Sequence, residues 1–522
     1  MGKVFLLDCT LRDGGYVNDW AFGEESIKGF CRKIAQTGID FLEVGFIKGD
    51  SYNPDRSLFP DIQSISRIIQ PKNDKLQYVG MLDMSAPIAM ERLTPYDGSS
   101  VDGIRVIFKK DKMDLAYRYC ERIKELGYFF TVNFVSTDLY SDKELIEGIE
   151  RFDALQPRAM TIVDTFGVIK RKSFLRIAYL ADNNLSPEIA LAYHAHNNLQ
   201  QAFSNAEALV EMGLQRDIII DACVFGMGRG AGNLNLELFA EYLNENCGTA
   251  YKIEPMLEVM DEYLNDIYKT KFWGYSLPLY LSATTGSHPN YAIYLAEKDS
   301  LPVKAFHELL QKISKPDKAV FSKERAEKYY RKYMENYVDD KETVQKLAHE
   351  LAGRKVVVLA PGKTLATHRQ IVEEASNNAV VIAANFTGME FHVDYVFSSN
   401  MRRYGKIQGK TQAKCIITSN MKDADSYDYM VNYSSYTSRY PEIIDNSGIM
   451  ILKLLIAAEV KEVFIAGMDG YTEDSETAYY DTSLYYDFSK AARERNRLIS
   501  EELKDIGRHL KMTVLTPSIY DV

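Results

Sequence analysis

The sequence predicts an α/β protein in which a (β/α)8 TIM barrel with a helical extension precedes a second, Rossmann-like α/β domain. Eight short apolar runs alternate with amphipathic stretches over residues 1–250, and unusual polar residues stand directly after several of these runs. Alternating strands and helices are typical of a parallel sheet, and in a closed barrel the residues after the strands meet on one face. A second alternating region begins near residue 353.

The eight runs are predicted to be strands because each is short, apolar and followed by a helical pattern. In chain order they are VFLLD, FLEVGF, LQYVGML, GIRVIF, FFTVNFV, MTIVD, IALAYH and DIIIDA. The intervening segments, such as EESIKGFCRKIAQTG and MDLAYRYCERIKELG, have the apolar spacing of amphipathic helices. Residues 1–250 are therefore expected to form the barrel.

Two further regions follow the predicted barrel. Residues 251–352 contain helical patterns without convincing strands, and we expect a helical extension packed on the barrel. Residues 353–522 return to alternation and are expected to form the Rossmann-like domain. Its predicted strands are KVVVLA, AVVIAAN, VDYVFSS, AKCIITS, EVFIAG and MTVLTP, with helices over residues 364–376 and in GIMILKLLIAAE.

Composition excludes several classes of protein. The chain has 522 residues, 46% of them hydrophobic and 26% charged, and no segment approaches the roughly 20 uncharged apolar residues of a membrane span. A net charge of -11 argues against a nucleic-acid partner. The six cysteines form no CxxC pair and the N-terminus lacks a signal-peptide pattern, so we expect a cytoplasmic protein. A homo-oligomer is compatible with all of this.

The most informative polar residues are Asp13, His194 and His196. Each follows or ends an apolar run, and two histidines that are two positions apart point to the same side of a strand. One carboxylate and two imidazoles can hold a divalent cation and leave coordination positions open for a substrate. An isolated HxH pair has an ordinary structural interpretation, but here the glycine-rich segment ACVFGMGRGAGNLNLE follows the eighth run, and its Asn233 is a candidate fourth ligand.

Five motifs in this order resemble the DRE-TIM metallolyases over the first 340 residues or so, and most closely the 4-hydroxy-2-oxovalerate aldolases. The motifs are DCTLRDGG, EVGF, VDTFG, HAHNN and GxGRGAGN. The resemblance implies that Asp13, His194 and His196 bind Mn²⁺ or Mg²⁺. Related 3-hydroxy-3-methylglutaryl-CoA lyases imply Asn233 as a further metal ligand.

The same resemblance implies a carbon–carbon lyase or aldolase that works through a metal-stabilised pyruvate-type enolate on a small 2-oxo acid and an aldehyde. Arg12 would add fixed positive charge beside the enolate. Tyr16 stands where these aldolases have a histidine base, and a phenol with a pKa near 10 is a poor base at neutral pH. Tyr16 is thus left as an acid, a pocket wall or a sign of different chemistry. Tyr275 is matched to a family tyrosine that covers the active site.

Four more residues are candidates for substrate binding because they stand at predicted strand ends. Each also has a structural interpretation, as a hydrogen-bonding partner between strands or as a helix cap. They are Glu43, Arg105, Asn133 and Thr165.

The C-terminal region has its own candidate site. KVVVLAPGKTL places a Pro-Gly turn between a strand and a helix, where backbone N–H groups could receive an anion. With AANF, NSGIMIL and VFIAGMDGY, the layout resembles the nucleotide-binding domain of bacterial sialyltransferase-like proteins. This resemblance implies a nucleotide or nucleotide-sugar ligand, with cofactor-binding candidates Gly362, Asn385, Ser447 and Asp469.

Three functions stay open from the sequence. The leading hypothesis is the metal-dependent lyase, with a role in surface-sugar biosynthesis expected from the domain fusion. A second places glycosyl- or nucleotidyl-transferase activity in the C-terminal domain with the barrel as scaffold, although His509, the only histidine after His392, is in the final helix rather than in a site loop. A third makes the chain a non-catalytic metabolite-binding protein, supported by Tyr16 in place of the base.

Overall fold

The computed structural model describes residues 2–298, 300–301, 303–318, 320–387, 390–472, 479–480 and 491–520. The chain divides into two compact units, Met1–Asn290 and Tyr291–Val522. Each unit contains one parallel sheet and is described separately.

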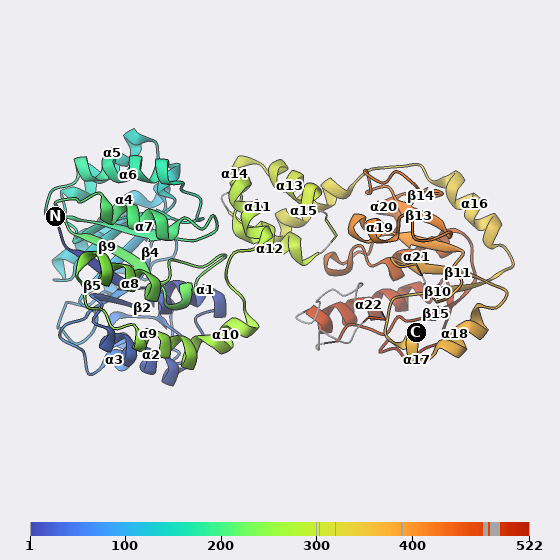
Figure 1. The fold of residues 1–522 in the computed structure, drawn as a ribbon, viewed down its shortest axis with the longest axis horizontal. Coiled ribbons are helices and arrows are strands. Elements are labelled where there is room, and N and C mark those ends of the chain that lie inside the picture. The colour runs from blue at the N-terminus through green and yellow to red at the C-terminus, as the bar shows by residue number, and fades with distance from the viewer. Residues whose placement is uncertain are drawn as a thin grey trace. The chain divides into compact units, whose positions relative to one another are not determined.

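The first unit is a closed parallel barrel, as predicted (Figure 1). Its strands follow the order β1-β9-β8-β7-β6-β5-β4-β2, and pairing of β1 with β2 closes the sheet, while the short β3 (Leu58–Phe59) pairs with the outer part of β2. The barrel strands are β1 (Val4–Asp8), β2 (Phe41–Ile47), β4 (Gln77–Asp83), β5 (Gly103–Phe108), β6 (Phe129–Phe134), β7 (Ala159–Asp164), β8 (Ala190–Ala195) and β9 (Ile218–Ala222). All eight coincide with the predicted apolar runs.

Helices connect the barrel strands and cover the outside of the sheet (Figure 1). In α5 a capping box between Ser141 and Glu144 satisfies two backbone N–H groups that the first turn leaves without partners. The connecting helices are α2 (Glu24–Thr37), α3 (Ile62–Ile69), α4 (Met113–Glu125), α5 (Asp142–Asp153), α6 (Arg171–Asn184), α7 (Ala202–Glu211) and α8 (Leu236–Cys247).

Two apolar layers follow from the alternation of side chains along each strand. Leu7 and Cys9 belong to a cluster inside the barrel, together with Phe41 and Ile219, whereas Leu6 packs in the larger core between strands and helices. The small side chains of this inner cluster, such as Ala192, leave room for the polar residues at the carboxyl ends of the strands. The barrel is therefore a packed core with its polar groups gathered at one face.

Residues 251–352, the predicted helical extension, are helical in their described part. The division between the two units falls at residue 290, inside this segment. Its earlier helices therefore belong with the barrel and its later ones with the C-terminal sheet, because their contacts are divided in that way. The helices are α9 (Glu254–Val259), α10 (Asn265–Thr270), α11 (Leu277–Thr285), α12 (Pro289–Glu297), α13 (Val303–Lys312), α14 (Lys315–Lys318), α15 (Lys323–Met334) and α16 (Lys341–Leu351), with a π-helical turn Met260–Leu264 between α9 and α10.

The second unit is built on an open parallel sheet with the order β14-β13-β12-β11-β10-β15-β16, as expected for a second α/β domain. The chain moves outward from β10 in one direction and then returns to β15 on its other side. The gap between the carboxyl ends of β10 and β15 is thus a topological switch point. The strands are β10 (Lys355–Leu359), β11 (Ala379–Ala384), β12 (Tyr395–Ser398), β13 (Lys414–Thr418), β14 (Tyr429–Val431), β15 (Glu462–Ala466) and β16 (Lys511–Val514).

The predicted helix over residues 364–376 is interrupted. His368 has φ -120° and ψ 28°, which is outside the helical region, and it separates α17 (Thr364–Thr367) from α18 (Arg369–Ser376). The apolar helix α21 (Ser447–Ala457) is buried on most of its surface, in agreement with its almost uniformly apolar sequence. The remaining helices are α19 (Met401–Ile407), α20 (Tyr433–Tyr436) and α22 (Ala492–Ile506).

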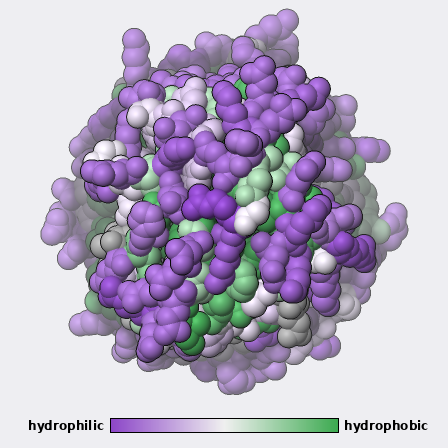
Figure 2. All heavy atoms as spheres, turned by 90° about the vertical axis from the view of Figure 1, so that its right-hand side faces the viewer, coloured by the Kyte–Doolittle hydropathy of each residue, from purple (hydrophilic) through white to green (hydrophobic). Residues whose placement is uncertain are grey.

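The surface is that of a polar protein on the face drawn in Figure 2, where hydrophobic atoms form small areas between hydrophilic side chains. Within the described ranges, no helix combines the length and the apolar character needed to cross a bilayer.

Candidate metal centre and active site

The three predicted metal ligands meet at the carboxyl face of the barrel. Asp13 is in a π-helical turn, Thr10–Gly14, directly after β1, and a π-turn of this kind is frequent at functional sites. His194 is in β8 and His196 follows that strand. Asp13 Oδ2 lies 3.0 Å from His194 Nε2 and 3.5 Å from His196 Nε2, and all three side chains are buried. These atoms form a group that could hold a metal ion.

Asn233 fits a fourth ligand position. Its backbone forms a β-bridge with His196, so the amide is held beside the histidines. The amide nitrogen donates to Cys223 Sγ at 3.2 Å and to the carbonyl of Met227 at 3.0 Å. Its Oδ1 is buried and accepts no hydrogen bond from any described residue. A buried acceptor without a donor is costly, and a divalent cation would satisfy it.

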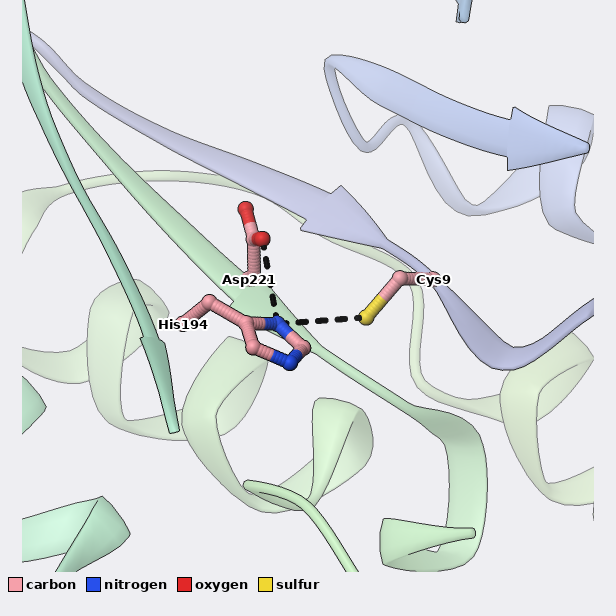
Figure 3. A group of neighbouring side chains, drawn as sticks. All are labelled: Cys9, His194 and Asp221. Carbon is pink, nitrogen blue, oxygen red and sulfur yellow. Dashed lines mark hydrogen bonds and ion pairs between the residues drawn. The ribbon is translucent and has the colours of Figure 1, made fainter. Parts of the chain in front are cut away.

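His194 is also held from its other side, as Figure 3 shows. Asp221 Oδ2 lies 3.2 Å from His194 Nδ1, and Cys9 Sγ lies 3.9 Å from the same nitrogen. The atoms of Cys9, His194 and Asp221 are also close enough together to bind a metal ion. Burial raises the pKa of the Cys9 thiol well above its usual range, and a protonated thiol is a poor ligand. The geometry instead makes Asp221 a carboxylate that orients His194, leaving Nε2 for the metal.

A closed ring of charged groups surrounds the centre. Arg12 lies 3.4 Å from Asp13 and 2.7 Å from Glu43. Arg105 lies 3.3 Å from the other oxygen of Glu43 and 2.5 Å from Asp221. Asp221 contacts His194, and His194 contacts Asp13, so the ring is closed. Every member of this ring is buried, so each charge depends on its neighbours for stabilisation.

The ring and burial determine the protonation of the ligands. Burial alone would raise the pKa of Asp13, but Arg12 and the two imidazoles outweigh it and hold this pKa well below its usual range. Burial lowers the pKa of His196 to about 3, so its imidazole is neutral at neutral pH. For His194, burial would lower the pKa, but Asp13 and Asp221 raise it well above its usual range. A carboxylate and a neutral imidazole are thus present for metal binding.

Several predicted substrate residues are used by this ring. Glu43 lies between two guanidinium groups and Arg105 between two carboxylates, and Arg105 also donates to Asn133 Oδ1 at 3.1 Å. Thr165, in the loop after β7, accepts a hydrogen bond from the backbone of Ser136 at 2.8 Å. The positions of these side chains favour a positioning role, and their contact with a substrate stays a prediction.

Comparison with known proteins identifies the barrel. A family model described as HMGL-like matches residues 3–261. The barrel belongs to the HMGL-like family. The match covers the metal group and the ring of charges and ends before the C-terminal domain.

Relatives of this HMGL-like barrel are lyases and aldolases. A 4-hydroxy-2-oxovalerate aldolase from Serratia proteamaculans is 26% identical over 243 residues, which is 46% of this chain and 71% of that protein. An oxaloacetate decarboxylase from Mycobacterium tuberculosis is 24% identical over 245 residues, which is 45% of this chain and 68% of that protein. The solved N-terminal domain of a putative aldolase from Bacteroides vulgatus, 24% identical, covers 56% of this chain and 96% of its own, with a TM-score of 0.48. The family depends on divalent metals, and its enzymes are of the lyase and aldolase type.

Tyr16 lies at the mouth of the HMGL-like barrel, in α1 (Gly15–Asn18), and 41% of it is exposed. The centre of its ring lies 4.8 Å from the centre of the Trp20 ring and 5.4 Å from Cζ of the Arg229 guanidinium. Burial of the hydroxyl, with the nearby charge of Asp13, raises the pKa of Tyr16 above 10. The phenol therefore keeps its proton at neutral pH, which favours a donor over a base.

Tyr275 is not brought to the metal group by any contact among the described residues. It is 55% exposed in the loop before α11, and its ring contacts Tyr280 at 6.4 Å. The two residues before it are anchored to the glycine-rich loop, because Trp273 donates to the carbonyl of Phe225 and Gly274 to that of Gly230. The role of Tyr275 as a cover of the active site stays a prediction, supported by the contacts of Trp273 and Gly274 with the glycine-rich loop.

Asp221 is the functional residue that the sequence interpretation missed. It is fully buried in β9, within the run DIIIDA. The available signal was an acidic residue inside an otherwise apolar strand, which requires a buried partner of opposite charge. The identity of that partner, Arg105, could not be read from the sequence because it is 116 residues away.

The four predicted cofactor residues of the C-terminal domain line one pocket at the switch point between β10 and β15. The pocket encloses about 980 Å³ of empty space, part of it open to solvent. Asn385 donates to Ser447 Oγ at 2.5 Å, and Ser447 begins α21. Asp469 accepts hydrogen bonds from the backbone and the hydroxyl of Thr364, and a side chain on Gly362 would collide with Asp469 and Gly467. Gly362 and Asp469 therefore shape the pocket wall.

Proposed function

We propose that the barrel is a divalent-metal-dependent lyase that makes or breaks a carbon–carbon bond of a small 2-oxo acid through a pyruvate-type enolate. The observation that carries this proposal is the convergence of Asp13, His194 and His196, with the unsatisfied Oδ1 of Asn233 beside them. The family of the barrel and the names of its relatives support it.

Different residues of the chain would supply positive charge and a proton for the reaction. A bound Mn²⁺ or Mg²⁺ would supply positive charge that polarises the substrate's keto group. Arg12, fixed by Glu43 and Asp13, adds a second positive charge that needs no reorganisation during the reaction. Tyr16 keeps its proton at neutral pH because its pKa is raised, and it would donate this proton to an oxygen of the second substrate.

The names of two relatives support a proposal for the bond that is made or broken. One is named for 4-hydroxy-2-oxovalerate and another for oxaloacetate. Both compounds are 2-oxo acids, and cleavage between C3 and C4 would leave the same pyruvate enolate. We therefore propose a small 2-oxo acid and an aldehyde as the substrates.

The test is exchange of the C3 protons of pyruvate for deuterium, followed by NMR on the full chain loaded with Mn²⁺ or with Mg²⁺. Enolate formation predicts exchange without any aldehyde. Arg12→Ala should slow it about 100-fold, the usual effect of removing one such electrostatic donor. Arg32→Ala, an exposed arginine on α2, is the matched control. Lack of exchange in protein that holds stoichiometric metal, with any 2-oxo acid tested, would instead support the non-catalytic, metabolite-binding alternative.

A second site is supported by the pocket of the C-terminal domain. We propose that it binds a nucleotide or a nucleotide-sugar, since it lies at a topological switch point, where open α/β sheets bind ligands. Arg403 and Arg495 line it, as does the N-terminus of α21, and all three attract a phosphate. A role in surface-sugar biosynthesis belongs to this proposal.

Calorimetric titration of the full chain with nucleoside mono- and diphosphates tests this second site. Binding should be lost in Arg403→Gln and kept in the control Arg402→Gln, whose side chain is exposed on the same helix. Turnover of a nucleotide-sugar would favour the transferase alternative, with the barrel as its scaffold. Equal binding by both variants would contradict the assignment of the pocket.

A further inference from the structure

Arg229 stands apart from the other arginines of the active site. It lies in the loop between β9 and α8, beside Gly230 and Gly232, whose φ angles of 69° and 80° form a turn that favours glycine. Arg229 is partly exposed, and its guanidinium lies 5.4 Å from the centre of the Tyr16 ring. This contact holds the cation at the mouth of the barrel.

In the described part of the chain, Arg229 forms no ion pair with a carboxylate. Arg12 and Arg105 are each paired with two carboxylates in the buried ring. By contrast, no carboxylate among the described residues lies within 4.0 Å of the Arg229 guanidinium, which contacts the face of the Tyr16 ring. A fixed cation above a reaction centre attracts an anionic ligand from solution.

Of two groups near Arg229, His288 adds no charge and Lys109 adds a positive one. Burial lowers the pKa of His288 to about 4, with a contribution from Arg229, so this imidazole is neutral at neutral pH. His288 contacts Phe166 in the loop after β7, with ring centres 5.6 Å apart. Lys109, exposed after β5, adds positive charge on the same side. Asp13 and Asp83 are acidic groups that act on Tyr16, and Asp13 is enclosed by Arg12 and the imidazoles.

We propose that Arg229 binds a carboxylate or phosphate on the second substrate, so that the aldehyde used by this enzyme carries a negative charge. The inference rests on the proposed lyase function and adds the class of its second substrate. In the addition direction, C3 of pyruvate loses a proton and bonds to the aldehyde carbon, and the aldehyde oxygen takes up a proton. The ring of Tyr16 contacts Arg229, and Asp13 lies close enough to affect the pKa of the Tyr16 hydroxyl, so an aldehyde beside Tyr16 would have its far end near the guanidinium.

The carboxylate of the 2-oxo acid is a poorer match for Arg229. That carboxylate belongs next to the keto group, and the keto group belongs at the metal group with Arg12. Arg12 is 3% exposed, whereas Arg229 is in the partly exposed outer loop. The two arginines therefore occupy different depths and suit two different anionic groups.

The experiment compares matched aldehydes with the metal-loaded full chain and pyruvate. The pairs are 4-oxobutanoate against butanal, and glyceraldehyde 3-phosphate against glyceraldehyde. The wild type should use the charged member of at least one pair with a kcat/KM about 10- to 100-fold higher, the usual size of one charged hydrogen bond. The pair that shows the preference distinguishes carboxylate from phosphate.

Variants assign the preference to Arg229. Arg229→Met should abolish it mainly by raising KM for the charged aldehyde, Arg229→Lys should retain part of it, and Arg32→Met should leave it unchanged. Metal content, measured by elemental analysis, verifies that the variants keep the site. Equal use of charged and neutral aldehydes by the wild type would overturn the inference, as would a rise in KM for pyruvate alone in Arg229→Met. Failure of pyruvate to exchange its C3 protons would instead overturn the proposed function.

Discussion

At the scale of single residues, the active site is organised by charges that have no access to solvent. The ring contains the carboxylates of Asp13, Glu43 and Asp221 and the guanidinium groups of Arg12 and Arg105. Counting only these groups, three negative charges face two positive ones. These five side chains therefore carry a charge of -1, and a divalent cation can replace the proton that the raised pKa keeps on His194 in the metal-free protein.

Asp221→Asn tests whether the ring orients a metal ligand. The amide keeps the size of the side chain but leaves Arg105 without one counter-ion and weakens the hold on His194 Nδ1. We expect the Kd for Mn²⁺ to rise about 10- to 100-fold, as is usual for such outer partners of metal-bound histidines. Titration of the metal-free protein measures it. Asp217→Asn, in the turn just before β9, is the control, and an unchanged Kd in a folded Asp221→Asn protein would contradict the role given to Asp221.

Asp164 makes the stability of the barrel depend on pH. Burial raises the pKa of this carboxyl from 3.8 to about 7, although it accepts hydrogen bonds from the backbone of Val168 and Ile169. The folded state thus holds the proton more tightly than the unfolded state. This contribution to stability is complete below pH 3.8 and is lost as the pH rises through 7.

Between pH 5 and pH 8 this loss amounts to about 3 kcal/mol in the free energy of unfolding of the barrel, at roughly 1.4 kcal/mol per pKa unit. Urea unfolding at both values measures it. Asp164→Asn cannot titrate, so its difference between the two pH values should be smaller. Asp8, whose pKa burial also raises to about 7, keeps part of the slope in this variant. An unchanged slope would show that Asp164 is ionised in the folded protein.

The sequence predicted the metal group because Asp13, His194 and His196 are each tied to the end of a strand, and strand ends converge in any parallel barrel. It offered hydrogen bonding between strands as one interpretation of Glu43 and Arg105, but it did not predict that these two residues pair with each other. Which buried acid meets which buried base depends on the register of strands that are distant in the chain, and sequence periodicity carries no information on that register.

At the scale of elements, the loop after β7 packs closely against the backbone that follows β8. Gly167 has a φ of 61°, and a Cβ added there would lie 2.4 Å from the backbone nitrogen of Asn198 and 2.6 Å from the carbonyl oxygen of His196. The loop and the histidine strand thus approach too closely for any side chain. The glycine of the VDTFG motif is required by this contact rather than by the turn alone.

Gly167→Ala and Gly213→Ala form a matched pair that separates these two causes. Gly213 has a φ of 62° but nothing within 4 Å of an added Cβ. Gly213→Ala should lose only the conformational cost, about 1–2 kcal/mol. Gly167→Ala should lose more, because the backbone at His196 must move, and it should also bind metal more weakly. Urea unfolding and metal titration measure both effects, and equal losses of stability in the two variants would contradict the proposed contact.

Predictions of elements succeeded where one pattern was long and repeated. All eight predicted barrel strands are confirmed. They were predictable because burial on both faces makes each of them a continuous apolar run. The break at His368 and the short strand β14 were not predicted. Both depend on one or a few residues whose conformation is set by neighbouring elements rather than by their own sequence.

At the scale of the whole molecule, the family match and the compact unit end at different residues. The HMGL-like match ends at residue 261, whereas the first compact unit continues to Asn290. The additional segment contacts the glycine-rich loop, because Trp273 donates to the carbonyl of Phe225 at 2.9 Å and packs on its ring. These contacts support the loop that carries Arg229 and Asn233.

A shortened chain of residues 1–290 should therefore fold and bind one equivalent of metal, whereas a chain of residues 1–261 should bind it weakly or remain unfolded. Circular dichroism and elemental analysis of the two shortened proteins measure this difference. Trp273→Phe in the full chain is the finer test, since it removes the hydrogen bond to Phe225 but keeps most of the ring packing. A loss of one such bond costs about 1 kcal/mol of stability. Full metal binding by the chain that ends at residue 261 would show that the glycine-rich loop holds its conformation without the segment that follows the family match.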